Sequence, residues 1–494
     1  MTSLARLHPN TLDDLSALVR RPGYDRQSLA VGVLHLGLGA FHRAHQAVYT
    51  DRAITASGGD WGICGVSLRS DRVWRQLSPQ EGLFSVTECS AQGRSVEILG
   101  ALREVLVAPR EPLRVLERLA DPQVRVVTLT ITEKGYCLKP SSGLLDLEHP
   151  GIAADLSVDA LPQTAIGLLV RGLAMRRAGG AGGVTIMSCD NLSGNGRKLG
   201  AAVTTFAESV SEALRDWIVG HCTFPCTMVD RIVPATRPDD LAAAAQALGL
   251  EDRAAVMTES FSQWVVENKF AGPVPDWCAA GAELVADVAP FEEMKLRLLN
   301  ASHSAIAYLG LLAGRETVAE AIESPVLCEL IRRLMRDEMA PTLAGLEHFD
   351  LSAYQDDLLA RFANPELQHA TRQIAMDGSQ KIPQRLLPAI IARRAQGQQA
   401  PLSLLVLAAW ARYLLGENEQ GLRYEIQDPL AQTFAQLRSE SGGNPRGWIE
   451  SLLRVDAVFP PPLAADKAFA DALCRVYTGL LEKGSMAMLA EELA

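Results

Sequence analysis

A short apolar segment that runs directly into a glycine turn constrains the fold of this chain more than any other feature. Val31 to Leu36 is followed by Gly37-Leu38-Gly39, and the residues up to about Ala56 have helical character. In such a strand, turn and helix, the GxG turn places backbone N–H groups at the start of a helix, where a phosphate binds favourably. His42 replaces the third glycine of the usual dinucleotide fingerprint, so the pattern alone leaves dinucleotide binding and an ordinary turn equally open.

Beyond this turn, segments of strand and helix character alternate as far as about residue 289. Apolar or β-branched runs indicate strands at residues 61–68, 83–89, 94–99, 124–130, 184–187, 254–259 and 284–288. Helical patterns lie at 111–120 and 163–177. Strands that alternate with helices build a parallel sheet with helices on both faces. We therefore expect an α/β, Rossmann-type, doubly wound sheet, with an inserted hairpin that turns at Ala91-Gln92-Gly93.

The second expected strand ends in Arg69-Ser70-Asp71, further along the chain than the fingerprint requires. At this position of a dinucleotide fold, a carboxylate binds the ribose hydroxyls of NAD, whereas a neighbouring cation favours the 2′-phosphate of NADP. We expect NAD as the cofactor, with Asp71 bound to the ribose hydroxyls. Arg69 is the neighbouring cation that would instead favour NADP. The residues assigned to the cofactor are Gly37, Gly39, Ala40, Phe41, Arg69, Asp71 and Glu133.

The character of the chain changes at Pro290, and helical patterns prevail from there onward. They are clearest at residues 402–415, 446–455 and 467–481, and Ser352 with Gln355 forms a capping-box signature. Residues 376–385 are predicted to form a polar loop that carries two cations. A chain of 494 residues is long for a single core. We predict two domains: residues 1–289 bind NAD, and residues 290–494 form an α-helical substrate and catalytic domain.

Residues 291–304 place four polar side chains in one helix-forming run. At about 100° per residue, Glu292, Lys295, Asn300 and His303 fall within an arc of roughly 140°, so one site could contact all four. Burying such groups without partners costs several kcal/mol, which favours a binding site over a packed core. The alternative is an ordinary amphipathic helix whose Glu292 and Lys295 pair on the solvent face.

A further candidate follows the expected strand at 184–187, where the chain reads Ser188-Cys189-Asp190-Asn191. Ligands of open α/β sheets bind outside the carboxyl ends of the strands, so Asn191 is well placed to reach one. The alternative is an Asx-rich turn that caps a helix beginning near Gly196.

Composition excludes several classes of partner. The net charge is −11, and the lysines and arginines form no stripe with aromatic residues, so neither nucleic acid nor an acidic membrane surface is expected. The longest apolar run, residues 402–415, is too short to cross a bilayer, and the N-terminus has no signal-peptide pattern. Nine scattered cysteines fit the reduced thiols of a cytosol. We predict a cytoplasmic protein with a small-molecule substrate and no obligate protein partner.

Two groups of potential zinc ligands occur in the first half of the chain. They are His42-x2-His45 and His221-Cys222-x3-Cys226, and neither has a second set at a compact, recognised spacing. No metal is therefore expected.

Six motifs, spread over nearly the whole chain, resemble those of the polyol-specific long-chain dehydrogenases. This is the family of mannitol 2-dehydrogenase, fructuronate reductase (mannonate oxidoreductase) and arabinitol dehydrogenase. The motifs are HLGLGAFHRAHQA, TITEKGY, SCDN, FPCTMVDRIVP, KLRLLNASHS and MDGSQKIPQR. The resemblance implies an N-terminal Rossmann-type domain that binds NAD(H), a mostly helical C-terminal domain, and catalysis without a metal.

The family's KxxLLNxxH motif falls on Lys295, Asn300 and His303, and its SCDN motif ends at Asn191. By that resemblance Lys295 is the general base, the two asparagines stabilise the alkoxide, and His303 helps to orient the substrate. Glu292 matches a carboxylate that connects the lysine with solvent. The family often has glycine where this chain has an alanine at position 301, a change that narrows the pocket by a methyl group.

The resulting hypothesis is an NAD-dependent oxidoreductase that interconverts an open-chain polyol or sugar acid with its keto sugar. Mannitol/fructose is the first candidate pair; mannonate/fructuronate is the second, because FPCTMVDRIVP and the pattern around residues 364–385 look especially like the fructuronate reductase branch. A carboxylate substrate needs a cation. A protein that senses nucleotides and has lost the chemistry is the rival class, and it predicts a damaged base or amide pair. The residues assigned to the substrate are Val229, Asp230, Arg372, Lys381 and Arg385.

Overall fold

The computed structural model describes residues 4–90, 93–139, 142–157, 160–367 and 369–494. The chain forms two compact units, Met1–Ala289 and Pro290–Ala494. Ala91 and Gln92, two of the three residues predicted to turn the hairpin, lie outside the described residues.

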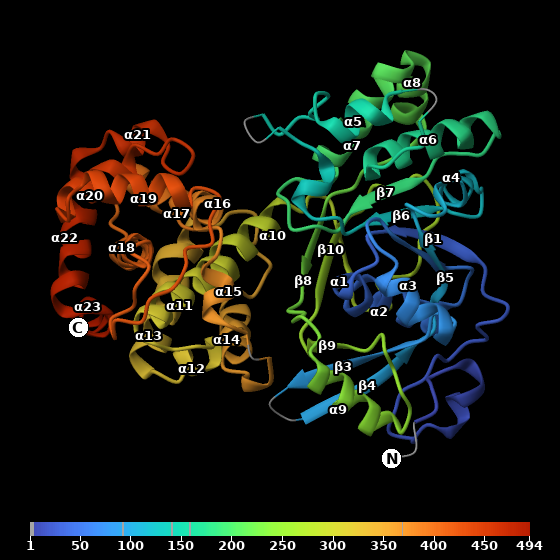
Figure 1. Cartoon of the computed structure of the whole chain (residues 1–494), viewed down its shortest axis with the longest axis horizontal. Helices are drawn as coiled ribbons and strands as arrows, with labels where there is room; N and C mark the ends of the chain where they lie inside the picture. The colour runs from blue at the N-terminus through green and yellow to red at the C-terminus, as the bar shows by residue number, and fades with distance from the viewer. Residues whose placement is uncertain (1–3, 91–92, 140–141, 158–159, 368) are drawn as a thin grey trace. The chain divides into compact units, whose positions relative to one another are not determined.

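A five-stranded parallel sheet forms the centre of the first unit (Figure 1). Its order is β5-β2-β1-β6-β7, and every neighbouring pair is parallel. The order confirms the predicted doubly wound, Rossmann-type sheet. Ligands of such sheets bind at the carboxyl ends of the strands, near the point where the winding reverses, which here lies between β1 and β6. The strands are β1 (Val31–Leu36), β2 (Gly62–Ser67), β5 (Leu102–Val107), β6 (Val126–Leu129) and β7 (Thr185–Ser188).

Helices cover both faces of this sheet, because alternate strand residues point to opposite sides. Leu34 and Leu36 of β1 pack with α4, α6, α7 and α8, whereas Val33 packs with α1 and α2. Figure 1 shows the two groups of helices on opposite sides of the sheet. Their bounds are α1 (Ala40–Ala44), α2 (Gln46–Ser57), α4 (Pro112–Ala120), α6 (Ala165–Ala178), α7 (Asn195–Val210) and α8 (Glu212–His221).

Two smaller sheets complete the first unit. The predicted hairpin is confirmed: β3 (Phe84–Ser90) and β4 (Gly93–Leu99) pair antiparallel from Phe84 opposite Leu99 to Ser90 opposite Gly93, and β3 also pairs in parallel with β9 (Val256–Glu259). The third sheet contains β8 (Thr227–Asp230), β10 (Gln263–Glu267) and β11 (Glu283–Val285). The remaining helices of the unit are η1 (Pro9–Asp14), α3 (Arg72–Leu77), η2 (Ser78–Gln80), η3 (Glu133–Tyr136), α5 (Pro150–Asp155) and α9 (Pro238–Leu248).

The second unit is helical in the part of it that the structure describes (Figure 1, yellow to red). All twelve residues of α11 are buried, and this helix packs against α15 and α18. After its polar first turn, α11 is apolar on nearly all sides, as is typical of a helix in the interior of a bundle. The helices from α10 to η7 are α10 (Ala289–Met294), η4 (Lys295–Asn300), α11 (Ala301–Leu312), α12 (Val318–Ile322), α13 (Pro325–Arg333), η5 (Leu334–Met339), η6 (Ala340–Thr342), α14 (Leu351–Phe362) and η7 (Pro365–Leu367). Those that follow are α15 (Thr371–Ala375), α16 (Gly378–Arg385), α17 (Leu387–Ala395), α18 (Pro401–Tyr413), α19 (Ala431–Glu440), α20 (Pro445–Leu453), α21 (Pro461–Ala464), α22 (Lys467–Lys483) and α23 (Ser485–Leu493).

Two local predictions in the second unit are wrong. Residues 378–385, predicted as part of a polar loop, form helix α16. Asp428 anchors its start by accepting hydrogen bonds from the N–H (2.8 Å) and Oγ (2.6 Å) of Ser379, a contact from 49 residues away that local sequence does not reveal. The capping box predicted at Ser352 is also wrong, because Ser352 lies inside α14, two residues after the true cap, Asp350, whose carboxylate accepts a hydrogen bond from the N–H of Ala353 at 2.9 Å.

Candidate active site

The glycine turn after β1 uses its two glycines for different reasons. Gly37 has a φ of 98°, and a Cβ added there would lie 2.1 Å from the carbonyl oxygen of Thr130, so the turn itself requires glycine. Gly39 has an ordinary φ of −112°, and a Cβ added there would meet only the Gly37 carbonyl oxygen, at 3.7 Å. Packing therefore leaves open space beside Gly39, which is the space a pyrophosphate would need close to the backbone.

His42, which replaces the third fingerprint glycine, is part of the packing beneath this turn. Its ring is buried and stacks on His35 of β1 with 3.4 Å between centroids. His35 is held by Thr128 (2.8 Å) and Thr130 (2.9 Å). Burial lowers the pKa of His35 to about 3 and that of His42 well below its ordinary value, so both rings are neutral near pH 7. In the usual fingerprint, the third glycine lets the helix pack closely against the strand. In this chain, the stacked rings of His35 and His42 fill that position instead.

Ala40 and Phe41 open α1 and are partly exposed, at the end of the helix where the first N–H groups have no intrahelical partner. Asp71 follows β2 and precedes α3, and its carboxylate accepts a hydrogen bond from Arg75 Nε at 2.9 Å and forms an ion pair with Arg110. The hydrogen bond from Arg75 lowers the pKa of Asp71. Arg69 is exposed beside it. The predicted ribose ligand is therefore already paired with two arginines that the sequence reasoning did not include.

Asp190 links the ends of β6 and β7, and the sequence reasoning gave it no role. Its carboxylate accepts hydrogen bonds from the N–H groups of Ile131 (2.8 Å) and Thr132 (2.9 Å) and from the hydroxyl of Tyr136 (2.6 Å). Thr132 has a φ of 65° and a ψ of 161°, a conformation that costs a non-glycine residue about 1–3 kcal/mol. Asp190 thus fixes a strained loop immediately before Glu133, which is exposed at the start of η3.

Asn191 is exposed three residues beyond β7, at the carboxyl edge of the sheet. The alternative role as a helix cap is wrong: α7 begins at Asn195, its N-cap is Gly194, and no side chain caps it. The buried amide of this turn is Asn195, which donates to the Thr227 carbonyl oxygen at 2.8 Å. Asn191 lies at the edge where ligands of such sheets bind.

Val229 and Asp230, assigned to the substrate, end strand β8 and are both buried. The side chain of Val229 packs in the apolar core of the first unit. The neighbouring Arg231 forms an ion pair with Glu88 at 2.7 Å and donates to the carbonyl oxygens of Ala44 and Glu259. Within the FPCTMVDRIVP motif, Arg231 therefore has a structural role in the first unit.

In the second unit, the expected polar helix contains a π-helical turn. Residues 295–300 are π-helical, and the N–H of Ala301 donates to the carbonyl oxygen of Leu296, five residues earlier. In an α-helix, residues five apart are separated by about 140° around the axis, whereas in a π-helical turn they lie on one face. The predicted α-helical geometry is therefore wrong here, and the π turn brings Lys295 and Asn300 closer than that geometry allows. Such turns occur frequently at functional sites.

The polar side chains of this turn are buried rather than solvated. Lys295 is 9 % exposed, Asn300 7 % and His303 8 %. Nδ2 of Asn300 and Nε2 of His303 have no hydrogen-bond partner within the described part of the chain. Burial lowers the pKa of His303 well below its ordinary value, and the nearby His369, Arg385, Arg361 and Lys295 lower it further, so the ring is neutral. Glu292 is only partly buried, one turn before Lys295.

The three cations assigned to the substrate have different surroundings. Arg385, the last residue of α16, donates from Nη1 to the carbonyl oxygen of Asn300 (3.2 Å) and to Ser304 Oγ (3.1 Å). Lys381 donates to the carbonyl oxygen of Ile374 at 3.1 Å, and burial lowers its pKa to about 8. Arg372 is exposed, and its guanidinium lies 5.9 Å from the centre of the Tyr424 ring. Arg385 is the cation in direct contact with the polar turn.

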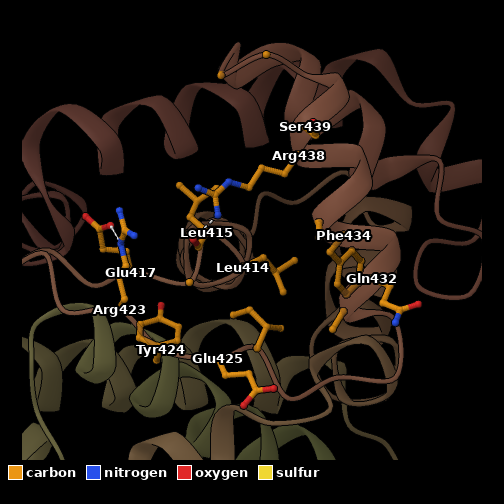
Figure 2. A pocket seen from close by; sticks show the side chains of 16 residues that line it. Leu414, Leu415, Glu417, Arg423, Tyr424, Glu425, Gln432, Phe434, Arg438 and Ser439 are labelled. Carbon is orange, nitrogen blue, oxygen red and sulfur yellow. Dashed lines mark hydrogen bonds and ion pairs between the residues drawn. The ribbon is translucent and has the colours of Figure 1, made fainter.

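A pocket at the end of α18 does not include the predicted site. Figure 2 shows Tyr424, Phe434 and Arg438 around it. Among the described residues, the pocket meets the predicted site residues at one point, where Arg372 lies over the ring of Tyr424. Leu415 accepts a hydrogen bond from Arg438 on its carbonyl oxygen at 2.5 Å, so the charge of that arginine is directed at the pocket wall.

The described residues contain no group of three or more His, Cys, Asp and Glu side chains placed to bind a metal. The zinc candidates are engaged otherwise: His221 Nδ1 lies 2.8 Å from the Trp217 carbonyl oxygen, His45 Nε2 lies 3.0 Å from that of Gln263, and Cys222 and Cys226 are buried free thiols. In the same part of the chain, no helix is long and apolar enough to span a membrane.

Known proteins with the same two-part sequence organisation identify the family. The models of the mannitol dehydrogenase Rossmann domain and of the mannitol dehydrogenase C-terminal domain match residues 31–279 and 287–480. The chain belongs to the mannitol dehydrogenase family.

Relatives within the family carry different names. D-mannonate oxidoreductase of Escherichia coli is 42 % identical over 479 residues, which cover 96 % of this chain and 98 % of that protein. Mannitol 2-dehydrogenase of Phaeosphaeria nodorum is 37 % identical over 498 residues, covering 98 % and 86 %. The ternary complex of Pseudomonas fluorescens mannitol 2-dehydrogenase with NAD and D-mannitol has a TM-score of 0.88 at 36 % identity and covers 99 % of both chains. Family membership is thus clear, and the relatives differ in the substrate that their names give.

Proposed function

We propose that this protein is an NAD-dependent oxidoreductase that oxidises a secondary alcohol of an open-chain polyol or sugar acid to the ketone. The observation that carries the proposal is the polar turn that begins at Lys295. Two buried nitrogen atoms, Asn300 Nδ2 and His303 Nε2, have no partner in the described chain. Buried polar groups are almost always hydrogen-bonded, so unpartnered ones indicate a ligand.

NAD supplies the hydride acceptor of the proposed reaction. The residues that would hold it are those of the glycine turn, Gly37 to Phe41, together with Asp71 and Glu133. The open space beside Gly39 supports this assignment, because no packing contact in the described chain explains the missing side chain there. NAD is also the cofactor named with the Pseudomonas fluorescens relative.

The chemistry needs a base for the hydroxyl proton and donors for the developing alkoxide. We assign the base to Lys295, a buried amine at the start of the polar turn; a base must be neutral to accept the hydroxyl proton. The free amide of Asn300 is assigned to the alkoxide, and Asn191 is assigned to it as a second amide donor. His303 is neutral and donates or accepts a hydrogen bond that orients the substrate. Glu292 is assigned to proton exchange between the base and solvent.

Mannitol/fructose and mannonate/fructuronate remain the two candidate substrate pairs, supported by relatives of both names. Val229, Asp230, Arg372 and Lys381 remain candidates for substrate contacts. We place the reaction in the cytoplasm, which nine free cysteines support, and we propose no obligate protein partner.

The test is a substrate panel of hexitols, pentitols and aldonates, each with NAD and with NADP, followed at the nicotinamide absorbance. The expected result is NAD reduction with at least one six-carbon substrate. Tight NAD binding without turnover of any substrate would contradict the proposal and favour the nucleotide-sensing alternative.

A further inference from the structure

Arg385, which is partly exposed, differs from three buried arginines of the first unit in how its charge is balanced. Arg231 is satisfied by a carboxylate and two carbonyl oxygens, and Arg176 donates to four carbonyl oxygens. Arg26 likewise donates to three carbonyl oxygens. Arg385 uses only Nη1, toward the Asn300 carbonyl oxygen and Ser304 Oγ. Its Nε and Nη2 donate to nothing in the described chain.

The surroundings of Arg385 are also without a compensating negative charge. It forms no ion pair with any described residue, and Tyr308 is the sole charge partner that raises its pKa, which burial lowers to about 10. Lys295, Arg361 and Arg385 all act as positive neighbours of His303. A partly desolvated guanidinium that has no counter-charge is stabilised when an anion binds its free N–H groups. The guanidinium of Arg385 therefore lies beside the polar turn without an ion pair to any described carboxylate.

The other two cations on α15 and α16, Lys381 and Arg372, do not present free N–H donors to the polar turn. Lys381 donates to the Ile374 carbonyl oxygen, and the charges of Asp377 and Asp428 act on it. Arg372 is exposed and lies over Tyr424. Only Arg385, of these three, combines contact with the polar turn and two free N–H donors on one edge of a planar guanidinium.

We propose that the Nε and Nη2 edge of Arg385 binds a carboxylate of the substrate, so that the preferred substrate is an open-chain sugar acid rather than an uncharged polyol. Parallel N–H groups on one edge of a guanidinium match the two oxygens of a carboxylate. Asn300 contributes to both parts of the proposed site. Its backbone carbonyl oxygen accepts a hydrogen bond from Arg385, and its side-chain amide is the donor assigned to the reacting oxygen. The inference rests on the proposed oxidoreductase function. The carboxylate is unchanged in the reaction, in which the alcohol carbon loses a hydride to NAD and its hydroxyl loses a proton to the base.

The test compares D-mannonate, D-mannitol and D-mannitol 1-phosphate as substrates of the wild type and of Arg385→Gln. The wild type is expected to prefer D-mannonate. In Arg385→Gln, KM for D-mannonate should rise about 10- to 100-fold, since a hydrogen bond to a charged group is lost. KM for D-mannitol should rise much less than KM for D-mannonate, because mannitol has no carboxylate to bind the lost N–H edge. Arg385→Lys, which keeps the charge but loses the planar edge, should fall between.

Arg336→Gln is the matched control, because Arg336 is exposed on the same unit and its ion pair is with the adjacent Asp337. Thermal unfolding and NAD affinity check that each variant is folded. If Arg385→Gln does not fold, the wild-type preference and its decrease with added salt decide the question. A preference for D-mannitol, or equal loss on D-mannonate and D-mannitol, overturns the inference, and a preference for the phosphate ester overturns the carboxylate assignment. If no compound is oxidised, the proposed function itself fails.

Discussion

At the residue scale, the choice between NAD and NADP depends on the charges around Asp71. Its carboxylate is paired with Arg75 and Arg110, and Arg69 lies exposed beside it. A carboxylate accepts hydrogen bonds from ribose hydroxyls and repels a 2′-phosphate, whereas arginine binds that phosphate. Asp71 therefore has two effects: it provides an acceptor and it neutralises two cations.

We predict that Asp71→Ala changes the cofactor preference instead of simply weakening NAD binding. Removing the carboxylate releases Arg75 and Arg110, so the ratio of kcat/KM for NADP to that for NAD should rise by about tenfold or more. Steady-state kinetics with both cofactors measure this ratio. Adding Arg110→Ala should cancel most of the gain. An unchanged ratio in Asp71→Ala would show that the ribose binds elsewhere.

The residues of the polar turn could be selected from the sequence because lysine, asparagine and histidine are unexpected in an apolar helix. Their burial follows that expectation, and their roles remain predictions. Two things could not be read from the sequence. The π turn at 295–300 is a backbone choice that local propensity does not determine, and the orientation of Arg385 depends on Asn300 and Ser304, more than 80 residues away.

At the element scale, the central strands were predictable because strands of a parallel sheet are buried on both faces and read as apolar runs. Strand β5 was missed, since Arg103 and Glu104 interrupt its apolar run at the edge of the sheet. Helix α16 was missed because its glycine, serine and proline are poor helix formers and its start is fixed by the distant Asp428. Strand β5 is established by its pairing with β2 and the start of α16 by Asp428, and local sequence reveals neither contact.

The stacked His35 and His42 make the junction of β1 and α1 sensitive to acid. Both pKa values are lowered by burial, that of His35 to about 3. The unfolded chain, with an ordinary histidine pKa near 6.5, therefore binds more protons than the folded chain at lower pH. The stability that these rings contribute is complete above about pH 6.5 and is lost as the pH falls from there.

We predict that His42→Phe reduces this acid sensitivity while keeping the stack. Below about pH 6, each such histidine costs about 1.4 kcal/mol of unfolding free energy per pH unit, and the variant should recover that amount. Urea unfolding of wild type and variant at pH 7 and pH 5 gives the difference. His221→Gln, at an exposed position, should follow the wild type. An identical pH dependence in His42→Phe would mean that the ring is not neutral in the folded protein.

At the scale of the whole molecule, the proposed cofactor residues and all the proposed catalytic residues except Asn191 belong to different compact units. The glycine turn and Asp71 lie in Met1–Ala289, and Lys295, Asn300 and His303 lie in Pro290–Ala494. The two matched family regions, residues 31–279 and 287–480, fall one in each unit. Substitutions in the two units should therefore separate cofactor binding from chemistry.

We predict opposite kinetic signatures for Lys295→Ala and Gly39→Val. Lys295→Ala should lower kcat about 10²- to 10⁴-fold and remove the pKa of the base from the pH profile of the rate. NAD affinity, measured by fluorescence titration, should stay within about twofold. Gly39→Val should weaken NAD binding and leave kcat at saturating NAD nearly unchanged, because its side chain enters space that the described protein leaves open. Gly37→Ala is the contrasting control, since its Cβ would meet the Thr130 carbonyl oxygen and should destabilise the fold. If Lys295→Ala keeps the wild-type pH profile and most of the rate, another group is the base, and His303 is then the first candidate.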